Sequence, residues 1–199
     1  MTRRRYFILT LFLAGGLGGS FATVAWLDPR PRLIWNASAS APIGLYRLQV
    51  GNQAARGDLV AIMPPRDLAQ QMAKRRYLAN GMPMLKRIAA LPGQTVCRHG
   101  ANVSIDGARV AVAHPRDRSG RPLPVWRGCH IVPAHQLFVI NAVPDSFDSR
   151  YFGPIPDAGL IGRAQPLFTR DAPDKPLVWR GLGYSTASPT ATKDHAPCR

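Results

Sequence analysis

The chain has 199 residues, enough for one sizeable core together with an anchor and a tail. Its formal net charge is +15, every acidic residue is an aspartate, and lysine occurs only four times. Because glutamate and lysine favour exposed helices, while the 19 prolines and 18 glycines favour turns, this composition argues against an all-helical fold.

The basic composition raises the question of nucleic-acid binding. The dense basic runs are Arg3–Arg5 and Lys74–Arg76, and neither is interleaved with aromatic residues over several turns. Scattered arginines suit a soluble surface or an anionic membrane surface equally well. We therefore expect contact with membrane lipid, and a membrane-tethered DNA-binding protein is the least favoured interpretation.

An uncharged stretch of 22 residues, Tyr6–Leu27, follows the first arginines. A helix of this length is about 33 Å long, sufficient to cross a bilayer core. The arginines before it and Asp28 after it place the N-terminus in the cytoplasm by the positive-inside rule. We predict a retained transmembrane anchor at residues 1–28. The alternative is a cleaved secretory signal ending near Thr23–Ala25, which would export the same domain.

Residues 29–170 are expected to form one β-rich domain. Strands are expected within Gly57–Ile62, Val103–Ile105, Arg109–Val112 and Gln136–Ile140. The Asp106–Gly107 pair between two of these strands is typical of a β-hairpin turn. The soluble helix candidate is Asp67–Leu78. Residues 171–199 are rich in Pro, Ser, Thr and Ala without periodicity, which predicts a disordered tail.

The chain has three cysteines, Cys97, Cys129 and Cys198. In an exported domain Cys97 and Cys129 could form a disulfide, which we favour on the compartment argument. The alternative is two buried free thiols, and the spacing of the two residues does not decide between them. No Cys or His pair has ligand spacing suited to a four-coordinate zinc site, so we expect no metal.

A hydrolase needs a nucleophile, a base beside it and donors for the oxyanion. The sequence lacks the nucleophile elbow of the α/β-hydrolases. The histidines lie in segments without other catalytic signals, so a His-based triad is not expected. The histidines are His99, His114, His130, His135 and His195.

The segment Asn36–Tyr46 contains two serines, Ser38 and Ser40. Their spacing would point both side chains the same way on an extended strand, before Pro42 and Gly44 turn the chain. One hydroxyl could then attack a carbonyl while the other donates to the oxyanion. The alternative is a polar linker that follows the anchor.

Lys86 is a rare lysine inside the apolar run Met84–Leu91. Lysine is seldom fully buried, so its side chain could reach solvent from a strand edge. If it is buried instead, desolvation lowers its pKa and leaves an amine able to accept a serine proton. A Ser-Lys dyad is a known variant of the Ser-His-Asp arrangement.

A third segment, Asp145–Gly153, resembles the Ser-x-Asp-Ser-Arg-(Tyr)-x-Gly box of bacterial type I signal peptidases. Lys86–Gly93 resembles the lysine box of that family, and Gly57–Asp58 resembles its Gly-Asp box. The three boxes occur in the family's order behind a membrane anchor, and the resemblance covers residues 1 to about 168. It implies a mainly β, signal-peptidase-like fold of short strands around a Ser-Lys dyad, preceded by one N-terminal transmembrane helix.

One departure narrows the resemblance. Type I signal peptidases usually place Met directly after the nucleophilic serine, whereas here Ala41 and then Pro42 follow Ser40. The stretch Asn36–Tyr46 instead is similar to the conjugative-transfer signal peptidases called TraF, as is Trp126–Cys129. Members of that family mature the pilin subunit of a conjugation apparatus, and some of them join its ends.

The resemblance also implies residue roles. Ser40 matches the nucleophile and Lys86 the general base, while the Ser38 hydroxyl supplements the Ser40 N–H in the oxyanion hole. Ser146 matches a serine that orients the lysine amine.

Asp148 and Arg150 match a pair that fixes the Asp145–Gly153 box beneath the active site. No cofactor is implied. The expected location is the bacterial inner membrane, with a cytoplasmic N-terminus and a periplasmic catalytic domain.

We therefore predict a membrane-anchored serine endopeptidase that processes exported precursors. Its expected partners are a propilin of a conjugative or type IV secretion system or another preprotein as substrate, inner membrane lipid, and other proteins of that apparatus. The alternatives are a general type I signal peptidase that acts on many preproteins and a non-catalytic membrane-anchored scaffold of a secretion channel.

Overall fold

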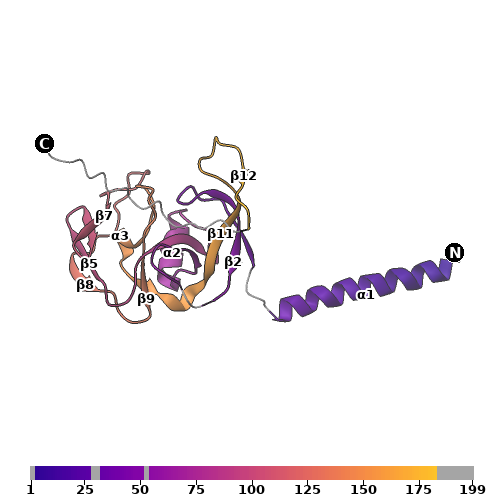
Figure 1. Ribbon diagram of the computed structural model, residues 1–199. Coiled ribbons are helices and arrows are strands. Elements are labelled where there is room, and N and C mark those ends of the chain that lie inside the picture. The colour runs from indigo at the N-terminus through magenta and orange to yellow at the C-terminus, as the bar shows by residue number, and fades with distance from the viewer. Residues whose placement is uncertain (1–2, 28–31, 52–53, 183–199) are drawn as a thin grey trace. The chain divides into compact units, whose positions relative to one another are not determined.

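The computed structural model describes residues 3–27, 32–51 and 54–182 (Figure 1). The chain divides into two units, Met1–Pro31 and Arg32–Arg199. The predicted boundaries at residues 28 and 170 remain predictions about domain organisation.

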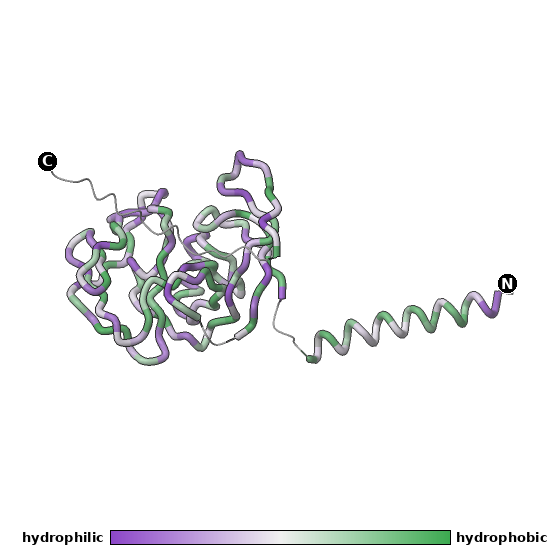
Figure 2. Tube along the Cα trace, in the orientation of Figure 1, coloured by the Kyte–Doolittle hydropathy of each residue, from purple (hydrophilic) through white to green (hydrophobic). Residues whose placement is uncertain are grey.

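The first unit contains helix α1 (Arg3–Leu27), and its segment Arg3–Val24 is long and apolar enough to span a membrane. Figure 2 shows apolar residues along most of this helix. Its hydroxyl groups donate to backbone carbonyls four residues earlier: Thr10 to Tyr6, Ser20 to Gly16 and Thr23 to Gly19. Polar groups satisfied within the helix in this way suit a hydrocarbon environment.

The second unit is built on two antiparallel sheets, which confirms the predicted mainly β fold. The larger sheet has the strand order β1-β2-β11-β3-β4-β9-β10, and β12 pairs with β11 (Figure 1). Its strands are β1 (Leu33–Asn36), β2 (Ile43–Gln49), β3 (Leu59–Ile62), β4 (Met84–Ala90), β9 (Gln136–Val139), β10 (Ile155–Pro156), β11 (Leu160–Arg170) and β12 (Val178–Trp179).

The smaller sheet has the order β7-β6-β5-β8. Its strands are β5 (Thr95–His99), β6 (Asn102–Ile105), β7 (Ala108–Val112) and β8 (Gly128–Ile131). The predicted hairpin is confirmed as β6–β7, and both turn residues have positive φ, 48° at Asp106 and 82° at Gly107. Two positive φ values are what the tight hairpin turn requires, and Asp-Gly supplies them at low cost.

Among the described residues of the second unit there are three helical segments: α2 (Arg66–Lys74), α3 (Ser149–Phe152) and the 3₁₀ turn η1 (Asp157–Gly159). The helix predicted at Asp67–Leu78 ends earlier than expected. After Arg75 the backbone of Arg76 adopts a φ of 58°, and the Tyr77 N–H turns back to the Met72 carbonyl at 2.9 Å. This reversal of the chain closes the helix, although helix-forming residues continue beyond it.

The interior strands β4 and β9 both contribute side chains to two separate apolar clusters of the core. Ile88 and Val139, which are register partners, pack in one apolar cluster. Ala90 and Phe138, the next pair, pack in another cluster against the smaller sheet. Because β4 is covered on both faces, a polar residue on it has little access to solvent.

Residues 171–182 belong to the segment that was predicted to be a disordered tail, and the structure describes them. Strand β12 lies within it and pairs with β11, where the Arg180 N–H donates to the Leu167 carbonyl at 2.8 Å. Exposed Trp179 lies opposite Phe168 in this pairing, a long-range contact that a local composition argument does not detect. Residues 183–199, including Cys198, lie outside the described residues.

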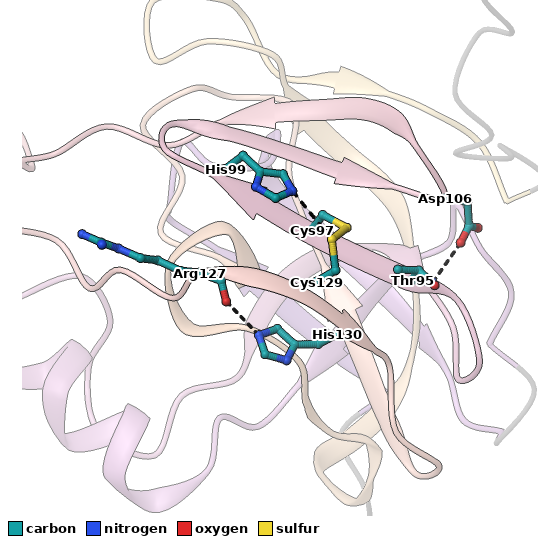
Figure 3. The surroundings of a disulfide bond; sticks show 7 residues. All are labelled: Thr95, Cys97, His99, Asp106, Arg127, Cys129 and His130. Carbon is teal, nitrogen blue, oxygen red and sulfur yellow. Dashed lines mark hydrogen bonds between the residues drawn. A yellow bond between two sulfur atoms is a disulfide. The ribbon is translucent and has the colours of Figure 1, made fainter.

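Cys97 and Cys129 are joined by a disulfide between β5 and β8 (Figure 3). The two residues are register partners in that pair of strands, so the sheet itself brings their side chains together. His99 lies beside them, with its Nε2 atom 3.7 Å from Cys129 Sγ. Within the described residues these three form the single group with potential ligand atoms close together, but disulfide sulfurs are not thiolate ligands.

Candidate active site

The two predicted serines lie in the connection between β1 and β2, where Ala39 and Ser40 form a turn. Asn36, the last residue of β1, fixes this connection with its side-chain amide. Its Oδ1 atom accepts from the Ser38 N–H at 3.0 Å. Its Nδ2 atom donates to the carbonyls of Ser38, Ala41 and Pro42 at 2.8, 3.1 and 3.0 Å. A buried amide satisfied at both ends makes the Ser40 backbone position well defined.

Tyr46 stabilises the same connection through a hydrogen bond. Its ring is fully buried on β2, and its hydroxyl donates to the Pro42 carbonyl at 2.6 Å. Burial raises the pKa of Tyr46, and the nearby Asp171 carboxylate raises it further. The phenol therefore stays protonated and remains a donor to this carbonyl.

The backbone beyond Pro42 comes unusually close to a neighbouring strand at Gly44. Gly44 has a φ of 143°, and a Cβ atom built there would lie 2.1 Å from the Phe168 carbonyl oxygen on β11. Only glycine fits this position, because any side chain would push β2 away from β11. The close approach anchors the chain that leaves the Ser40 turn.

Ser38 and Ser40 lie together, although not on an extended strand as expected. Their hydroxyl oxygens are 3.0 Å apart, and the Ser40 N–H donates to Ser38 Oγ at 3.3 Å. The expectation of a strand was wrong because the Asn36 side chain folds the segment into a turn. The turn still brings the two hydroxyls and the Ser40 N–H into one cluster.

Lys86 lies in the middle of β4, opposite Val60 of β3, and is only 4% exposed. Burial lowers the pKa of Lys86 to about 8, and the charge of Asp148 opposes this shift. The interpretation of a lysine that reaches solvent from a strand edge does not hold, because β4 has neighbours on both sides. At such a pKa a substantial fraction of the amine is neutral near pH 8 and can accept a proton.

Ser146 accepts a hydrogen bond of 2.7 Å from Lys86 Nζ. Ser146 is 2% exposed, so this hydroxyl is a fixed partner of the amine. It comes from the loop between β9 and α3, which the sequence places far from β4. This is the contact expected for a residue that orients the lysine.

Asn141 fixes β4 on both sides of Lys86. Its Nδ2 atom donates to the Leu85 carbonyl at 3.0 Å, and its Oδ1 atom accepts from the Arg87 N–H at 3.0 Å. Its own backbone N–H donates to Asp148 at 3.1 Å. Asn141 therefore connects the lysine strand to the Asp148 segment.

Asp148 and Arg150 form an ion pair of 2.7 Å whose side chains are 0% and 3% exposed. Asp148 also accepts from the Arg150 N–H at the start of α3, at 3.2 Å. The Arg150 guanidinium donates to the Asn141 carbonyl at 2.6 Å and to the Pro144 carbonyl at 3.0 Å. Each charge is thus paired and further hydrogen-bonded, which a buried ion pair needs in order to be tolerated.

One pocket of about 580 Å³ has Ser40, Lys86 and Ser146 in its wall, and we call it the Ser40 pocket. His114 also lines it, a residue for which the sequence carried no catalytic signal. Asp148 and Arg150 do not line this pocket. Cys97 and Cys129 do not line it either, and they belong to the smaller sheet.

A neighbouring pocket of about 610 Å³ has Trp35, Ser38 and Leu85 in its wall, and we call it the Trp35 pocket. Its lining is mostly apolar, and it shares Arg76 and Tyr77 with the Ser40 pocket. The bonded Ser38 and Ser40 hydroxyls therefore stand at the boundary between the two pockets. An extended peptide with its reacting carbonyl at this boundary could place residues in both.

Sequence reasoning missed Asn36, Tyr46 and Asn141 as functional positions. Asn36 and Tyr46 are the first and last residues of the motif that resembles TraF, but the sequence did not show which groups their side chains would hydrogen-bond. Asn141 directly follows the predicted strand Gln136–Ile140, and an asparagine ending an apolar strand was a weak signal at best.

Comparison with known proteins finds relatives over most of the chain. The family model described as "Signal peptidase, peptidase S26" matches residues 4–168. "Conjugal transfer protein TraF" of Agrobacterium tumefaciens (strain 15955) is 40% identical over 170 residues, which are 80% of this chain and 94% of that protein.

Two further relatives widen the comparison. "Probable conjugal transfer protein TraF" of Sinorhizobium fredii is 40% identical over 144 residues, covering 67% of this chain and 76% of that protein. "Signal peptidase I" of Leptolyngbya laminosa is 31% identical over 121 residues, covering 59% and 54% of the two chains.

Proposed function

The chain belongs to the peptidase S26 family of signal peptidases, and from this premise we propose that it cleaves exported precursors with a Ser40–Lys86 dyad. The observation that carries the proposal is the Ser40 pocket. It combines a serine hydroxyl with a buried amine of lowered pKa, and Ser146 orients that amine. A scaffold protein has no need of a desolvated lysine at this position.

In the first step, neutral Lys86 takes the Ser40 proton while Ser40 Oγ attacks the scissile carbonyl carbon. The carbonyl π electrons move onto oxygen and give a tetrahedral oxyanion. The Ser40 N–H and the Ser38 hydroxyl are the donors for this oxyanion. In the free protein these two groups bond to each other, so the substrate oxygen would take the place of that 3.3 Å contact.

In the second step, the Lys86 ammonium gives its proton to the leaving amine as the C–N bond breaks, leaving an ester on Ser40. Lys86 then removes a proton from a water molecule that attacks the ester and gives it to Ser40 Oγ as the C–O bond breaks, which releases the acid and restores the serine. If the substrate's own amine attacks instead, the product is a cyclic peptide. Asp148 and Arg150 keep the loop that contains Ser146 in place through both steps.

The relatives suggest which precursor is cut. Because two of them are conjugal transfer proteins, we propose the propilin of a conjugative transfer or type IV secretion system as the main substrate. Helix α1 would anchor the protein in the inner membrane with Arg3–Arg5 in the cytoplasm and the catalytic unit in the periplasm. Other proteins of the apparatus would then lie within reach as partners.

The test uses the full-length protein in detergent, incubated with a conjugative propilin and with an unrelated preprotein. We expect cleavage of the propilin, loss of cleavage in Ser40→Ala and Lys86→Met, and unchanged cleavage in two controls. Ser119→Ala removes an exposed serine from the same pocket, and Lys175→Met removes an exposed lysine elsewhere. Cleavage that survives both Ser40→Ala and Lys86→Met would rule out the dyad.

The substrate pair separates the remaining alternatives. Equal cleavage of both precursors would favour a general signal peptidase over dedicated pilin maturation. If neither variant impairs precursor processing in cells, a non-catalytic scaffold is favoured. The mass of the processed pilin distinguishes the products, because a cyclic peptide is one water lighter than the linear one.

A further inference from the structure

The Ser40 pocket has a strongly basic wall. Besides Lys86 it is lined by six basic side chains: Lys74, Arg75, Arg76, Arg116, Arg118 and Arg121. Two carboxylates, those of Asp117 and Asp145, share the lining, which leaves an excess of four positive charges. A basic wall of this kind concentrates negatively charged groups in the pocket.

The two carboxylates are already engaged. Asp117 pairs with Arg121 at 2.7 Å and also accepts from the Tyr77 hydroxyl. Asp145 pairs with Arg118 at 2.7 Å. These pairs neutralise two of the six cations and leave the others without an acidic partner from the lining.

The other four cations keep their charge available. Arg75 donates to the Pro122 carbonyl at 2.9 Å and Arg116 to the Gly120 carbonyl at 2.7 Å, but a neutral acceptor does not cancel a charge. In the part of the chain that the structure describes, the side chains of Lys74 and Arg76 have no hydrogen-bond or ion-pair partner, and both are exposed. Such side chains can turn toward a bound anion without breaking an existing contact.

Arg76 is the best placed of these cations, because it lines both the Ser40 pocket and the Trp35 pocket. Its backbone is fixed by the chain reversal after α2, in which the Arg76 N–H donates to the Ala73 carbonyl at 3.0 Å. The backbone of Arg76 is therefore held beside both pockets, and its side chain is free to turn toward either of them. Arginine in such a place suits bidentate recognition of a carboxylate.

We propose that the Ser40 pocket selects a substrate segment with an acidic side chain or a terminal carboxylate near the scissile bond. The segment on the other side of the bond is apolar and lies in the Trp35 pocket. This selection rests on the proposed peptidase function, and it adds the charge of the substrate to it. Because one pocket is basic and the other is apolar, the pair also fixes the direction in which a peptide binds.

The test measures cleavage of a peptide library from a bacterial proteome by the full-length protein in detergent, with new termini read by mass spectrometry. We expect Asp and Glu to be enriched on one side of the cleaved bond and apolar residues on the other. For a peptide pair that differs only in Asp or Asn at the enriched position, Arg76→Gln should lower kcat/KM of the Asp peptide about ten-fold. The Asn peptide should be unaffected. Arg47→Gln is the control, since Arg47 is an exposed β2 arginine outside both pockets.

The outcomes separate this proposal from the function on which it rests. Ser40-dependent cleavage that shows neither acidic enrichment nor a preference for bonds near a peptide's C-terminal carboxylate overturns the charge selection and leaves the peptidase function intact. Absence of Ser40-dependent cleavage overturns both. If Arg76→Gln leaves peptide selection unchanged but weakens binding to phosphatidylglycerol vesicles, the basic wall serves the membrane surface and the proposal is wrong.

Discussion

The Lys86 amine donates a 2.7 Å hydrogen bond to the Ser146 hydroxyl, in the wall of the pocket that also contains Ser40. Both partners are almost completely buried. The contact links the lysine strand to the Asp148 segment, so the position of the base depends on two parts of the chain at once.

The burial of Lys86 has a cost for stability. Its pKa is about 8 in the folded protein against an ordinary value of 10.5, so the unfolded chain binds the proton more tightly between these two pH values. The free energy of unfolding should therefore rise as the pH goes from about 8 to 10.5. Below pH 8 both states hold the proton, so the contribution of Lys86 is constant there and the free energy of unfolding is at its lowest. Lys86→Met should raise that free energy by about 3 kcal/mol at pH 7 and remove the dependence.

Chemical denaturation of the wild type, Lys86→Met and Lys175→Met at pH 7 and pH 10 measures this effect. Lys175→Met should follow the wild type, because that side chain is exposed. A Lys86→Met protein that is less stable than the wild type at pH 7 would show that the amine is not desolvated.

The rate of cleavage should depend on the same ionisation. Since the base must be neutral, kcat/KM should rise with pH to a plateau with a midpoint near 8. The measurement is a pH profile of peptide cleavage with the full-length protein in detergent. A flat profile between pH 6 and pH 9 would contradict a lysine base.

Ser146→Ala should move that midpoint. The Ser146 hydroxyl accepts from the amine and so stabilises its charged form, and its removal should shift the midpoint to lower pH. Loss of the orienting contact should also reduce kcat on the order of ten-fold or more, with little change in KM. Ser146→Thr, which keeps a hydroxyl, should restore part of kcat, and an unshifted midpoint in Ser146→Ala would show that Ser146 is only structural.

Asn141→Ala should damage the site from a distance. It leaves the Leu85 carbonyl and the Arg87 N–H without their side-chain partner, at a cost of about 1–3 kcal/mol in unfolding free energy. Because these groups flank Lys86, kcat should fall more than KM changes. Asn80→Ala, an exposed asparagine, is the matched control for both measurements.

Gly44→Ala should be among the most destabilising single substitutions in the chain. Its Cβ would lie 2.1 Å from the Phe168 carbonyl oxygen, and backbone on β11 would have to move. We expect a loss of more than about 3 kcal/mol, measured by denaturation. Gly51→Ala, which meets nothing within 4 Å, should change little.

Local patterns in the sequence were sufficient for several elements. The uncharged run Tyr6–Leu27 indicated α1, Asp106–Gly107 indicated the β6–β7 hairpin, and the apolar run Gln136–Ile140 indicated β9. Each depends on residues that are close in sequence, through side-chain periodicity or the φ values a turn requires. The three ordered boxes also indicated the family and singled out Lys86, and the Asn36–Tyr46 stretch singled out Ser40.

Local patterns failed at one chain reversal and at places where distant strands pair. The helix at α2 ended before its pattern did, and part of the expected disordered tail pairs with β11 as β12. The spacing of Cys97 and Cys129 left their pairing open until β5 and β8 placed them opposite each other.

The sequence by itself determined that a serine and a rare lysine occur in motifs of one peptidase family, behind an apolar stretch long enough to span a membrane. Only the tertiary structure decided that Ser40 lies in a turn held by Asn36, that Lys86 is buried with a lowered pKa, and that both line one pocket. The physical reason is that desolvation and hydrogen bonding depend on the atoms that surround a group in space. For Lys86 those atoms come from Ser146, Asp148 and Asn141, which are remote from it along the chain.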